Sequence, residues 1–390
     1  MNSIRIGRRE ARPLVQGGMG VGVSAHRLAG AVAREGGVGT VSSVDLRRHH
    51  PDLMRATGRD KAAIEAANLV ALDREVRAAR ELAAGEGAIA VNVMRAVSQY
   101  AAYVQQACAS GADAVVVGAG LALDLPELTQ DWPDVALVPI VSEARAAALI
   151  VRRWARRGRA PDAIVVEHPR YAGGHVGAAR VDEVADARFD FARVLPEIRA
   201  ALHAAGLEAD RIPLIAAGGI NSPGRVAQAH AAGADAVQAG TPFVATDECD
   251  AHANFKRVIA EAKPEDIVVF MSVAGLPARA VRTPWLAAYL EREGMLQSRA
   301  HKRPGCSLAW DCLAQCGLRD GLPRAGQFCI DHHLAAALRG DVDRGLFFRG
   351  SEALPFGSAI RPVRELFDYL LGDHLLADHL PARVPLAAAA

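Results

Sequence analysis

The chain has 390 residues, enough for one large domain with an appended region. Lys and Arg total 45 and Asp and Glu total 44. This near-zero net charge excludes a protein whose overall positive potential attracts nucleic acid or an anionic membrane. The N-terminal segment lacks the apolar run of a signal peptide, and no segment approaches the roughly 20 apolar residues of a membrane helix. Six cysteines in so long a chain do not form a disulfide framework, so we expect a cytoplasmic protein.

Eight short apolar segments, rich in β-branched residues, alternate with longer Ala-rich segments as far as residue 240. Near-continuous apolar strands separated by helices are typical of a parallel sheet that is covered by helices. We expect the strands at 13–16, 37–42, 88–94, 114–118, 136–142, 163–167, 213–217 and 236–239. Helical patterns between them include 24–35, 98–110, 143–157, 191–205 and 223–232.

The number of strand–helix units favours a closed (β/α)8 TIM barrel over an open doubly wound sheet. Three of the helices end in a repeated signal before a strand: Gly111 and Gly233 are each followed by Ala-Asp, and the glycine pair after Glu35 is a looser third case. The segment 20–25 fits a loose dinucleotide-binding motif, which would suit the doubly wound alternative. That match is weak in a glycine-rich segment, and the count of eight units argues against it.

After Thr241 the alternation of strands and helices stops. Helical patterns continue at 250–262, 284–294, 331–339 and 360–371, whereas 296–330 is irregular and contains four of the six cysteines. We therefore predict an α/β barrel over 1–241 and a mostly helical cap or second domain over 242–350. A C-terminal helix that returns to the barrel and a frayed tail would follow over 351–390.

Two glycine sites lie directly after the last two predicted strands. Gly218 and Gly219 follow the seventh strand, and Gly240 and Thr241 follow the eighth. In these barrels the active site lies at the carboxyl ends of the strands, and a phosphate is often held after strands seven and eight. Glycines let backbone amides approach an anion closely. The sequence predicts a phosphate site here, and the alternative is that these glycines only make tight turns.

Further candidate ligand-binding residues lie at the ends of the first and third predicted strands. Gln16, Gly17, Gly18 and Met19 offer an open backbone and a polarizable thioether, which could lie along a flat aromatic ring. Asn92 ends the third strand among apolar residues, and a buried amide must find hydrogen-bond partners. The alternatives are a tight turn with a packed methionine and an asparagine that caps a loop.

The segment after the sixth strand is the richest in reactive groups. Gly173 and Gly174 bring the chain close to a ligand and present His175, which can exchange a proton near neutral pH. Glu167 stands at the last position of the strand, where inward-pointing side chains of a barrel become catalytic. Alternation along the strand directs His168 away from Glu167. A structural loop histidine and a solvated carboxylate are the alternatives.

These residues resemble the nitronate monooxygenase group of FMN barrels, a superfamily that also holds flavin-dependent enoyl-acyl-carrier-protein reductases. The resemblance extends from about residue 12 to about residue 372. The residues that match the family motifs are 13–20, Asn92, 172–177, 216–220 and 238–241. It implies FMN as cofactor and a role for His175 as base or substrate contact. It also implies that Gly218, Gly219 and Gly240, with Thr241 beside them, bind the FMN phosphate.

The chain departs from the common family pattern in two places. Residues 168–172 separate Glu167 from the glycine pair, so the loop is longer than usual. The second departure is a segment with Cys306, Cys312, Cys316 and Cys329. Its spacing lacks paired Cys-x-x-Cys knuckles, so we interpret these residues as buried thiols and predict no metal site, with metal or cluster binding and redox chemistry as alternatives.

Three functions follow from this interpretation. The leading one is FMN-dependent oxidation of an alkyl nitronate or a similar small molecule, with dioxygen as electron acceptor. The second is an NAD(P)H-dependent flavin reductase that acts on an enoyl thioester, and the third is a non-redox phosphate-binding barrel or a catalytically silent flavin-binding partner. The use of NAD(P)H and the formation of a homodimer are left open by the sequence.

Overall fold

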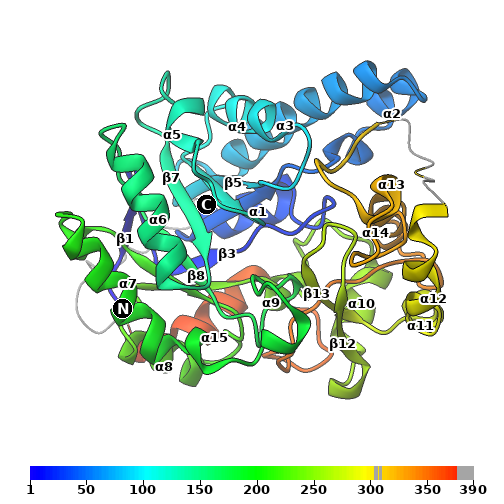
Figure 1. Ribbon diagram of the computed structural model, residues 1–390. Helices are drawn as coiled ribbons and strands as arrows, with labels where there is room; N and C mark the ends of the chain where they lie inside the picture. The colour runs from blue at the N-terminus through cyan, green and yellow to red at the C-terminus, as the bar shows by residue number, and fades with distance from the viewer. Residues whose placement is uncertain (303–305, 307–309, 376–390) are drawn as a thin grey trace, which may run out of the picture.

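The computed structural model describes residues 1–302, 306 and 310–375. Eight parallel strands close into a barrel in the order β10-β11-β3-β4-β5-β6-β7-β8 (Figure 1). Each predicted strand is confirmed. Their bounds are β3 (Leu14–Gln16), β4 (Val38–Ser42), β5 (Ala88–Met94), β6 (Ala114–Gly118), β7 (Ala136–Val141), β8 (Ile164–Glu167), β10 (Leu214–Ala217) and β11 (Ala236–Ala239).

Helices cover the outside of the barrel, as the (β/α)8 prediction requires. The predicted helices are present as α1 (His26–Arg34), α4 (Tyr100–Ala109), α6 (Ala144–Ala155), α7 (Phe191–Ala204) and α8 (Pro223–Ala231). Two further helices, α2 (Pro51–Thr57) and α3 (Lys61–Ala83), were not expected from the sequence. A short α5 (Leu125–Leu128) lies between β6 and β7. The long α3 packs along α1.

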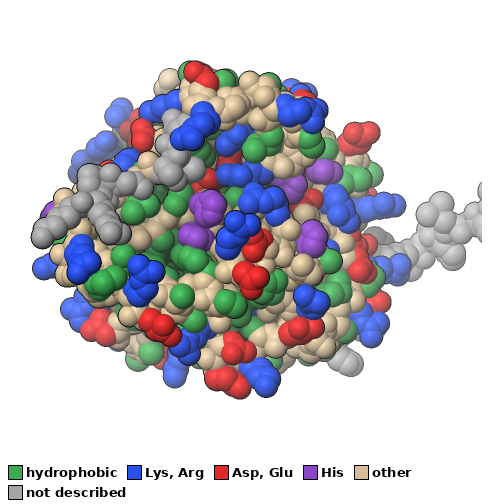
Figure 2. Space-filling model, turned by 90° about the vertical axis from the view of Figure 1, so that its right-hand side faces the viewer, with side chains coloured by type: hydrophobic (Ala, Val, Ile, Leu, Met, Phe, Trp, Pro, Cys, Tyr) green, Lys and Arg blue, Asp and Glu red, His purple; other side chains and the backbone are tan. Residues whose placement is uncertain are grey.

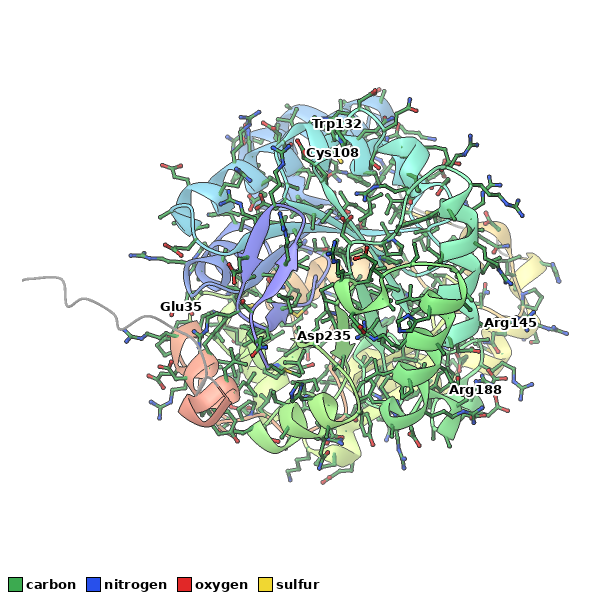
Figure 3. The ribbon with its side chains drawn as sticks, turned by 90° about the vertical axis from the view of Figure 1, so that its left-hand side faces the viewer. Glu35, Cys108, Trp132, Arg145, Arg188 and Asp235 are labelled. Atoms are coloured by element: carbon green, nitrogen blue, oxygen red, sulfur yellow. The ribbon has the colours of Figure 1, made fainter. Side chains whose placement is uncertain are left out.

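The aspartates of the repeated Gly-Ala-Asp sequence form hydrogen bonds between neighbouring strands. The carboxylate of Asp113 accepts a hydrogen bond from the amide of Ile89 (2.9 Å), and that of Asp235 accepts one from the amide of Leu214 (2.8 Å). Each aspartate therefore ties the start of its own strand to the start of the preceding one. A hairpin of β1 (Ile4–Ile6) and β2 (Arg9–Ala11) lies at this amino-terminal end of the barrel, the side that Figure 3 turns to the viewer.

The chain after β11 forms a cap to one side of the barrel, at the right in Figure 1. It contains helices in the segments predicted for them, but also two strands that the sequence analysis missed. The antiparallel pair β12 and β13 is extended by β9, which comes from the loop after β8. The elements are β9 (Gly174–His175), α9 (Thr241–Val244), α10 (Ala253–Glu261), β12 (Ile267–Met271), β13 (Pro277–Val281), α11 (Pro284–Leu290), α12 (Glu293–Ser298), α13 (Gly317–Asp320) and α14 (Ile330–Leu338).

The last described element is α15 (Val363–Leu375), which packs against α1 and α8. The tail predicted to fray, 381–390, lies outside the described residues. Within the part of the chain that the structure describes, no helix is long and apolar enough to cross a membrane. On the face that Figure 2 shows, basic and acidic side chains are interspersed.

We expect Gly39→Ala to destabilise the protein, because a Cβ at Gly39 would overlap the backbone carbonyl of Ala29 in α1. Overpacking of this kind costs roughly 1–3 kcal/mol of unfolding free energy. Urea unfolding followed by circular dichroism measures the loss. Gly294→Ala in α12 is the matched control, because nothing lies within 4 Å of the added methyl group. Equal stability of both variants would contradict the close contact of β4 with α1.

Candidate active site

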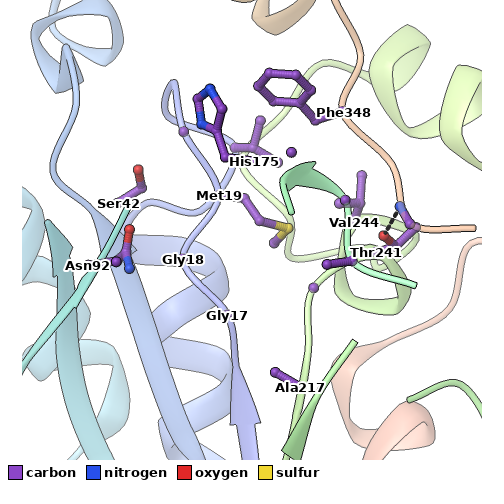
Figure 4. Close-up of a pocket in the computed structure, with 18 of the residues that line it drawn as sticks. Gly17, Gly18, Met19, Ser42, Asn92, His175, Ala217, Thr241, Val244 and Phe348 are labelled. Carbon is purple, nitrogen blue, oxygen red and sulfur yellow. Dashed lines mark hydrogen bonds between the residues drawn. The ribbon is translucent and has the colours of Figure 1, made fainter. Parts of the chain in front are cut away.

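A cavity of about 260 Å³ opens at the carboxyl ends of the barrel strands and is closed on one side by the cap (Figure 4). Every site residue predicted from the sequence lines it, with the exception of Gln16. Those residues lie at or after the carboxyl ends of five different strands, so closure of the barrel brings together segments that are far apart in the chain. The lining residues are Gly17, Gly18, Met19, Asn92, Glu167, Gly173, Gly174, His175, Gly218, Gly219, Gly240 and Thr241.

Gln16 is used inside the barrel instead. Its side chain is fully buried, and its Oε1 accepts a hydrogen bond from the amide of Thr40 (2.8 Å). Its Nε2 donates to the carbonyl of Gly17. Gln16 thereby holds the backbone at Gly17, where the lining of the cavity starts, but its own side chain does not line the cavity.

The wall after β3 consists of backbone and one thioether. A Cβ at Gly18 would overlap the side chain of Asn92, so only glycine allows the two strand ends to approach this closely. Asn92 makes one long hydrogen bond, from Nδ2 to the carbonyl of Val116 (3.5 Å), and otherwise faces the cavity. Met19 lies beside Gly240, whose added Cβ would be 3.6 Å from the methionine sulfur. A flat ring bound here could hydrogen-bond to the amide of Asn92 and pack against the backbone of Gly17 and Gly18.

His175 is positioned by the cap. It lies in β9, where it pairs with Ala278 of β13, and its Nε2 is 2.9 Å from Oγ of Ser272. The ring of Phe348 lies close by, with 5.8 Å between ring centroids (Figure 4). Burial lowers the pKa of His175 to about 4, so the imidazole is neutral at neutral pH and can accept a proton. His168 is directed away from this site and contacts Asp190 (3.1 Å).

Glu167 lines the cavity from the end of β8. Burial raises the pKa of Glu167 to about 7, and the nearby Arg279 guanidinium opposes this shift. Arg279 is itself buried and donates to the carbonyls of Pro169 (3.0 Å) and Ala172. It therefore holds the long loop after β8 in place. A carboxyl group with this pKa exchanges protons at neutral pH.

The opposite end of the cavity is a backbone cradle. Gly218 and Gly219 have φ angles of +94° and +78°, a conformation that favours glycine. Thr241 Oγ1 accepts a hydrogen bond from the amide of Gly350 (2.9 Å), which joins the β11 loop to the segment that precedes α15. The side chain of Ser222 caps the following helix, α8, whose N-terminus favours negative charge.

This end fits a phosphate group. Among the residues that the structure describes, neither Lys nor Arg lines the cavity. An anion here would therefore be held by backbone N–H groups, the hydroxyl of Thr241 and helix N-termini rather than by a cation. Together with the amide of Asn92 and the open backbone at Gly17 and Gly18, the donor set suits a flat ring that carries a phosphate ester.

One of the four cysteines of the segment 306–329, Cys312, lines the cavity, together with its neighbour Leu313. Burial raises the pKa of Cys329 to about 11 and that of Cys316 above its usual range, so these groups are thiols at neutral pH. Over residues 1–302, 306 and 310–375, no group of three or more His, Cys, Asp or Glu side chains could hold a metal ion. The described cysteines are free.

Several lining residues were missed by the sequence analysis. Phe348, Gly350, Leu334 and Asp331 come from the region after residue 330. Gln238, which the resemblance included, also lines the cavity, and a Cβ at Gly17 would lie 3.2 Å from its Nε2. No local pattern marks the later residues, because the cap brings them to the rim from distant parts of the chain.

The fold and the cavity define a (β/α)8 barrel with a candidate active site at the carboxyl rim. A model of the nitronate monooxygenase family matches residues 8–371 of the chain. The chain therefore belongs to the nitronate monooxygenase family, and it is an oxidoreductase. A stretch of 75 residues, 19% of the chain, is 36% identical to a probable nitronate monooxygenase of Staphylococcus saprophyticus. That stretch spans only 21% of the relative's length.

Solved structures show the same fold. FabK from Thermotoga maritima superimposes with a TM-score of 0.65 at 24% identity, over 92% of this chain and 91% of that one. Nitroalkane oxidase from Streptomyces ansochromogenes gives a TM-score of 0.62 at 21% identity, over 95% and 97% of the two chains. The enoyl reductase domain of MlnA from Bacillus amyloliquefaciens gives 0.55 at 14%, over 76% and 68%.

Glu167 makes stability depend on pH. Its pKa is about 7 in the folded protein and close to the ordinary 4.5 when unfolded, so folding favours the protonated form. The stabilisation is complete below pH 4.5 and is lost as the pH rises towards 7 and above. We expect wild-type protein without cofactor to lose roughly 1–3 kcal/mol relative to Glu167→Gln between pH 5 and pH 8.

Urea unfolding at both pH values measures this difference. Glu208→Gln is the control, because Glu208 is exposed on the surface and pairs with Arg211. A parallel pH dependence of wild type and Glu167→Gln would show that the carboxyl group is solvated.

Proposed function

We propose that the protein is an FMN-dependent oxidoreductase that oxidises alkyl nitronates or similar small molecules, with dioxygen as electron acceptor. The observation that carries the proposal is the position of a neutral, cap-held His175 in the same cavity as a backbone cradle at Gly218, Gly219 and Gly240. The barrel, 1–241, would hold the cofactor, and the cap, 242–350, would enclose the substrate.

The residues of the cavity fit FMN in two groups. Gly218, Gly219, Gly240 and Thr241 would bind the phosphate, and Gly17, Gly18, Met19 and Asn92 would lie along the ring. When bound, FMN supplies the capacity to accept two electrons from the substrate and to be reoxidised by dioxygen. The chain supplies binding, orientation and proton transfer. The amide of Asn92 can both donate and accept a hydrogen bond at a ring edge.

His175 is the proposed base. Its low pKa keeps the imidazole neutral, so that it can take a proton from the carbon beside a nitro group or hydrogen-bond the nitronate oxygens. The contact with Ser272 fixes the orientation of the ring. Glu167 lines the same cavity and, with its raised pKa, can hold a proton at neutral pH.

The first test is the visible spectrum of the purified protein, before and after an alkyl nitronate is added without oxygen. We expect a flavin band that the nitronate bleaches and that neither NADH nor NADPH bleaches. Bleaching only by a pyridine nucleotide would replace the proposal with the flavin reductase that the sequence left as an alternative. A flavin band that no donor bleaches would indicate a silent flavin-binding protein. Failure to bind FMN would leave a non-redox phosphate-binding barrel.

The second test is His175→Asn. We expect it to lower kcat/KM for nitroalkane oxidation by about 10²–10⁴-fold, the contribution of a positioned general base. The flavin content and its spectrum should be retained, because the phosphate cradle lies at the other end of the cavity. His203→Asn, an exposed site on α7, is the matched control. Unchanged activity of His175→Asn would remove His175 from the mechanism.

A further inference from the structure

The cysteine-bearing segment, 310–329 in the described part of the chain, has no role in the proposed function. It is nevertheless joined to the candidate active site at two places. Near its start it pairs with the loop after β5: the amide of Ala314 donates to the carbonyl of Ala96 (2.9 Å), and Leu313 forms an antiparallel bridge with Val97. The segment therefore extends the rim of the barrel at one side of the cavity.

The second joint is with the turn between β12 and β13. The amide of Gly317 donates to the carbonyl of Val273 in this turn (2.6 Å). The amide of Gly326 donates to the carbonyl of Ser272 (2.9 Å), whose hydroxyl group contacts the His175 ring. The segment thus bridges the loop after β5 and the turn that positions His175, so it lies at the cap end of the cavity.

The cavity wall that this region supplies is apolar. Leu313 and Val97 both line the cavity and are only 4% and 3% exposed. Ile330 and Leu334 of α14 line it too and belong to the same hydrophobic core. Cys312 completes the wall, and burial raises the pKa of its thiol, so the group is uncharged at neutral pH and packs as a small apolar side chain.

The carboxylate of Asp331 in α14 leaves this wall apolar, because its charge is satisfied within the protein. Its Oδ1 is fully buried, its Oδ2 accepts from Arg48 (2.7 Å), and a hydrogen bond links Asp331 to Asp45. Arg47 donates in turn to Asp45 (2.8 Å). Two guanidinium groups and two carboxyl groups therefore balance in a buried cluster. A ligand gains nothing from a charged group at this wall, but it gains by burying hydrocarbon there.

We propose that the wall formed by the cysteine-bearing segment and α14 binds an apolar chain of the substrate, so that the enzyme selects nitro compounds with a hydrocarbon chain of several carbons. The occupant follows from continuity, because the wall and His175 belong to one cavity. A substrate whose reacting carbon lies at His175 extends its remaining atoms along this wall. Leu313 and Leu334 are then residues that determine chain length.

The inference rests on the proposed function, because it concerns the part of the substrate that does not react. Its size follows from the transfer of methylene groups out of water, which is worth about fourfold in Kd for each group. The gain stops when the chain has filled the cavity. The inference therefore predicts a rise of affinity with chain length, followed by a limit that the wall residues set.

The test measures Kd for nitroethane, 1-nitrobutane, 1-nitrohexane and 1-nitrooctane by calorimetry without oxygen. The flavin of the loaded protein is reduced beforehand, so that it takes no electrons from the ligand and binding is measured alone. We expect Kd to fall about fourfold for each added methylene until the limit is reached. A Kd that is the same for all four compounds would overturn the inference.

Leu334→Trp and Leu334→Ala test which wall sets the limit. We expect the tryptophan to shorten the chain at which the gain stops and to weaken binding of 1-nitrooctane by about tenfold or more, the loss of two or more buried methylenes. The alanine should move the limit to a longer chain. Nitroethane should bind equally to both variants. Leu149→Trp is the matched control, because Leu149 lies on α6 and is 40% exposed.

A limit that neither Leu334 variant moves would place the chain along another wall and would also overturn the inference. Where Leu334→Trp loses nitroethane binding as well, its cavity has collapsed, and the wild-type series and Leu334→Ala decide the question. Failure of the proposed function is a separate result. In that case no nitronate is oxidised, although longer nitroalkanes still bind more tightly than nitroethane.

Discussion

Closure of eight parallel strands into a ring is the constraint on which the rest of the molecule depends. Each strand hydrogen-bonds to two neighbours, so every carboxyl end faces the same rim. The loops after β3, β5, β8, β10 and β11 are therefore close together in space, although they are far apart in the sequence. At the other end, Asp113 ties the start of β6 to that of β5, and Asp235 ties the start of β11 to that of β10.

A second level of organisation is the attachment of the cap. The two-residue strand β9 leaves the barrel loop after β8 and joins the antiparallel pair β12–β13, so that backbone hydrogen bonds set the position of His175. The buried guanidinium group of Arg279 reinforces the joint, because it donates to carbonyls of the β8 loop. Within the cap, Arg349 donates to the carbonyls of Ile259 (2.9 Å) and Gly350 (2.8 Å). These bonds satisfy loop carbonyls that burial would otherwise leave unpaired.

The two ends of the cavity differ in their physical character. At the glycine end, backbone amides and a helix N-terminus provide partial positive charge without a cation. At the cap end, burial keeps His175 neutral and Glu167 substantially protonated, while Asp331 is held by Arg48. The cavity thus has one region suited to an anion and another whose side chains are able to exchange protons.

The sequence by itself determined the eight strands, the glycine turns at Gly218 and Gly240, and the exposure of Asn92 and His175 to the rim. These features depend on local rules: apolar runs form buried strands, and a positive φ, as at Gly218, favours glycine. Only the tertiary structure decided the position of Gln16, which turns into the barrel to bond Thr40. The pairing of β9 with β13, the contact of Ser272 with His175, and the arrival of Phe348 and Asp331 at the cavity were equally beyond the sequence. These contacts join segments that are separated by about 100 residues or more. A local sequence pattern does not indicate which distant segment a loop will contact once the barrel has closed.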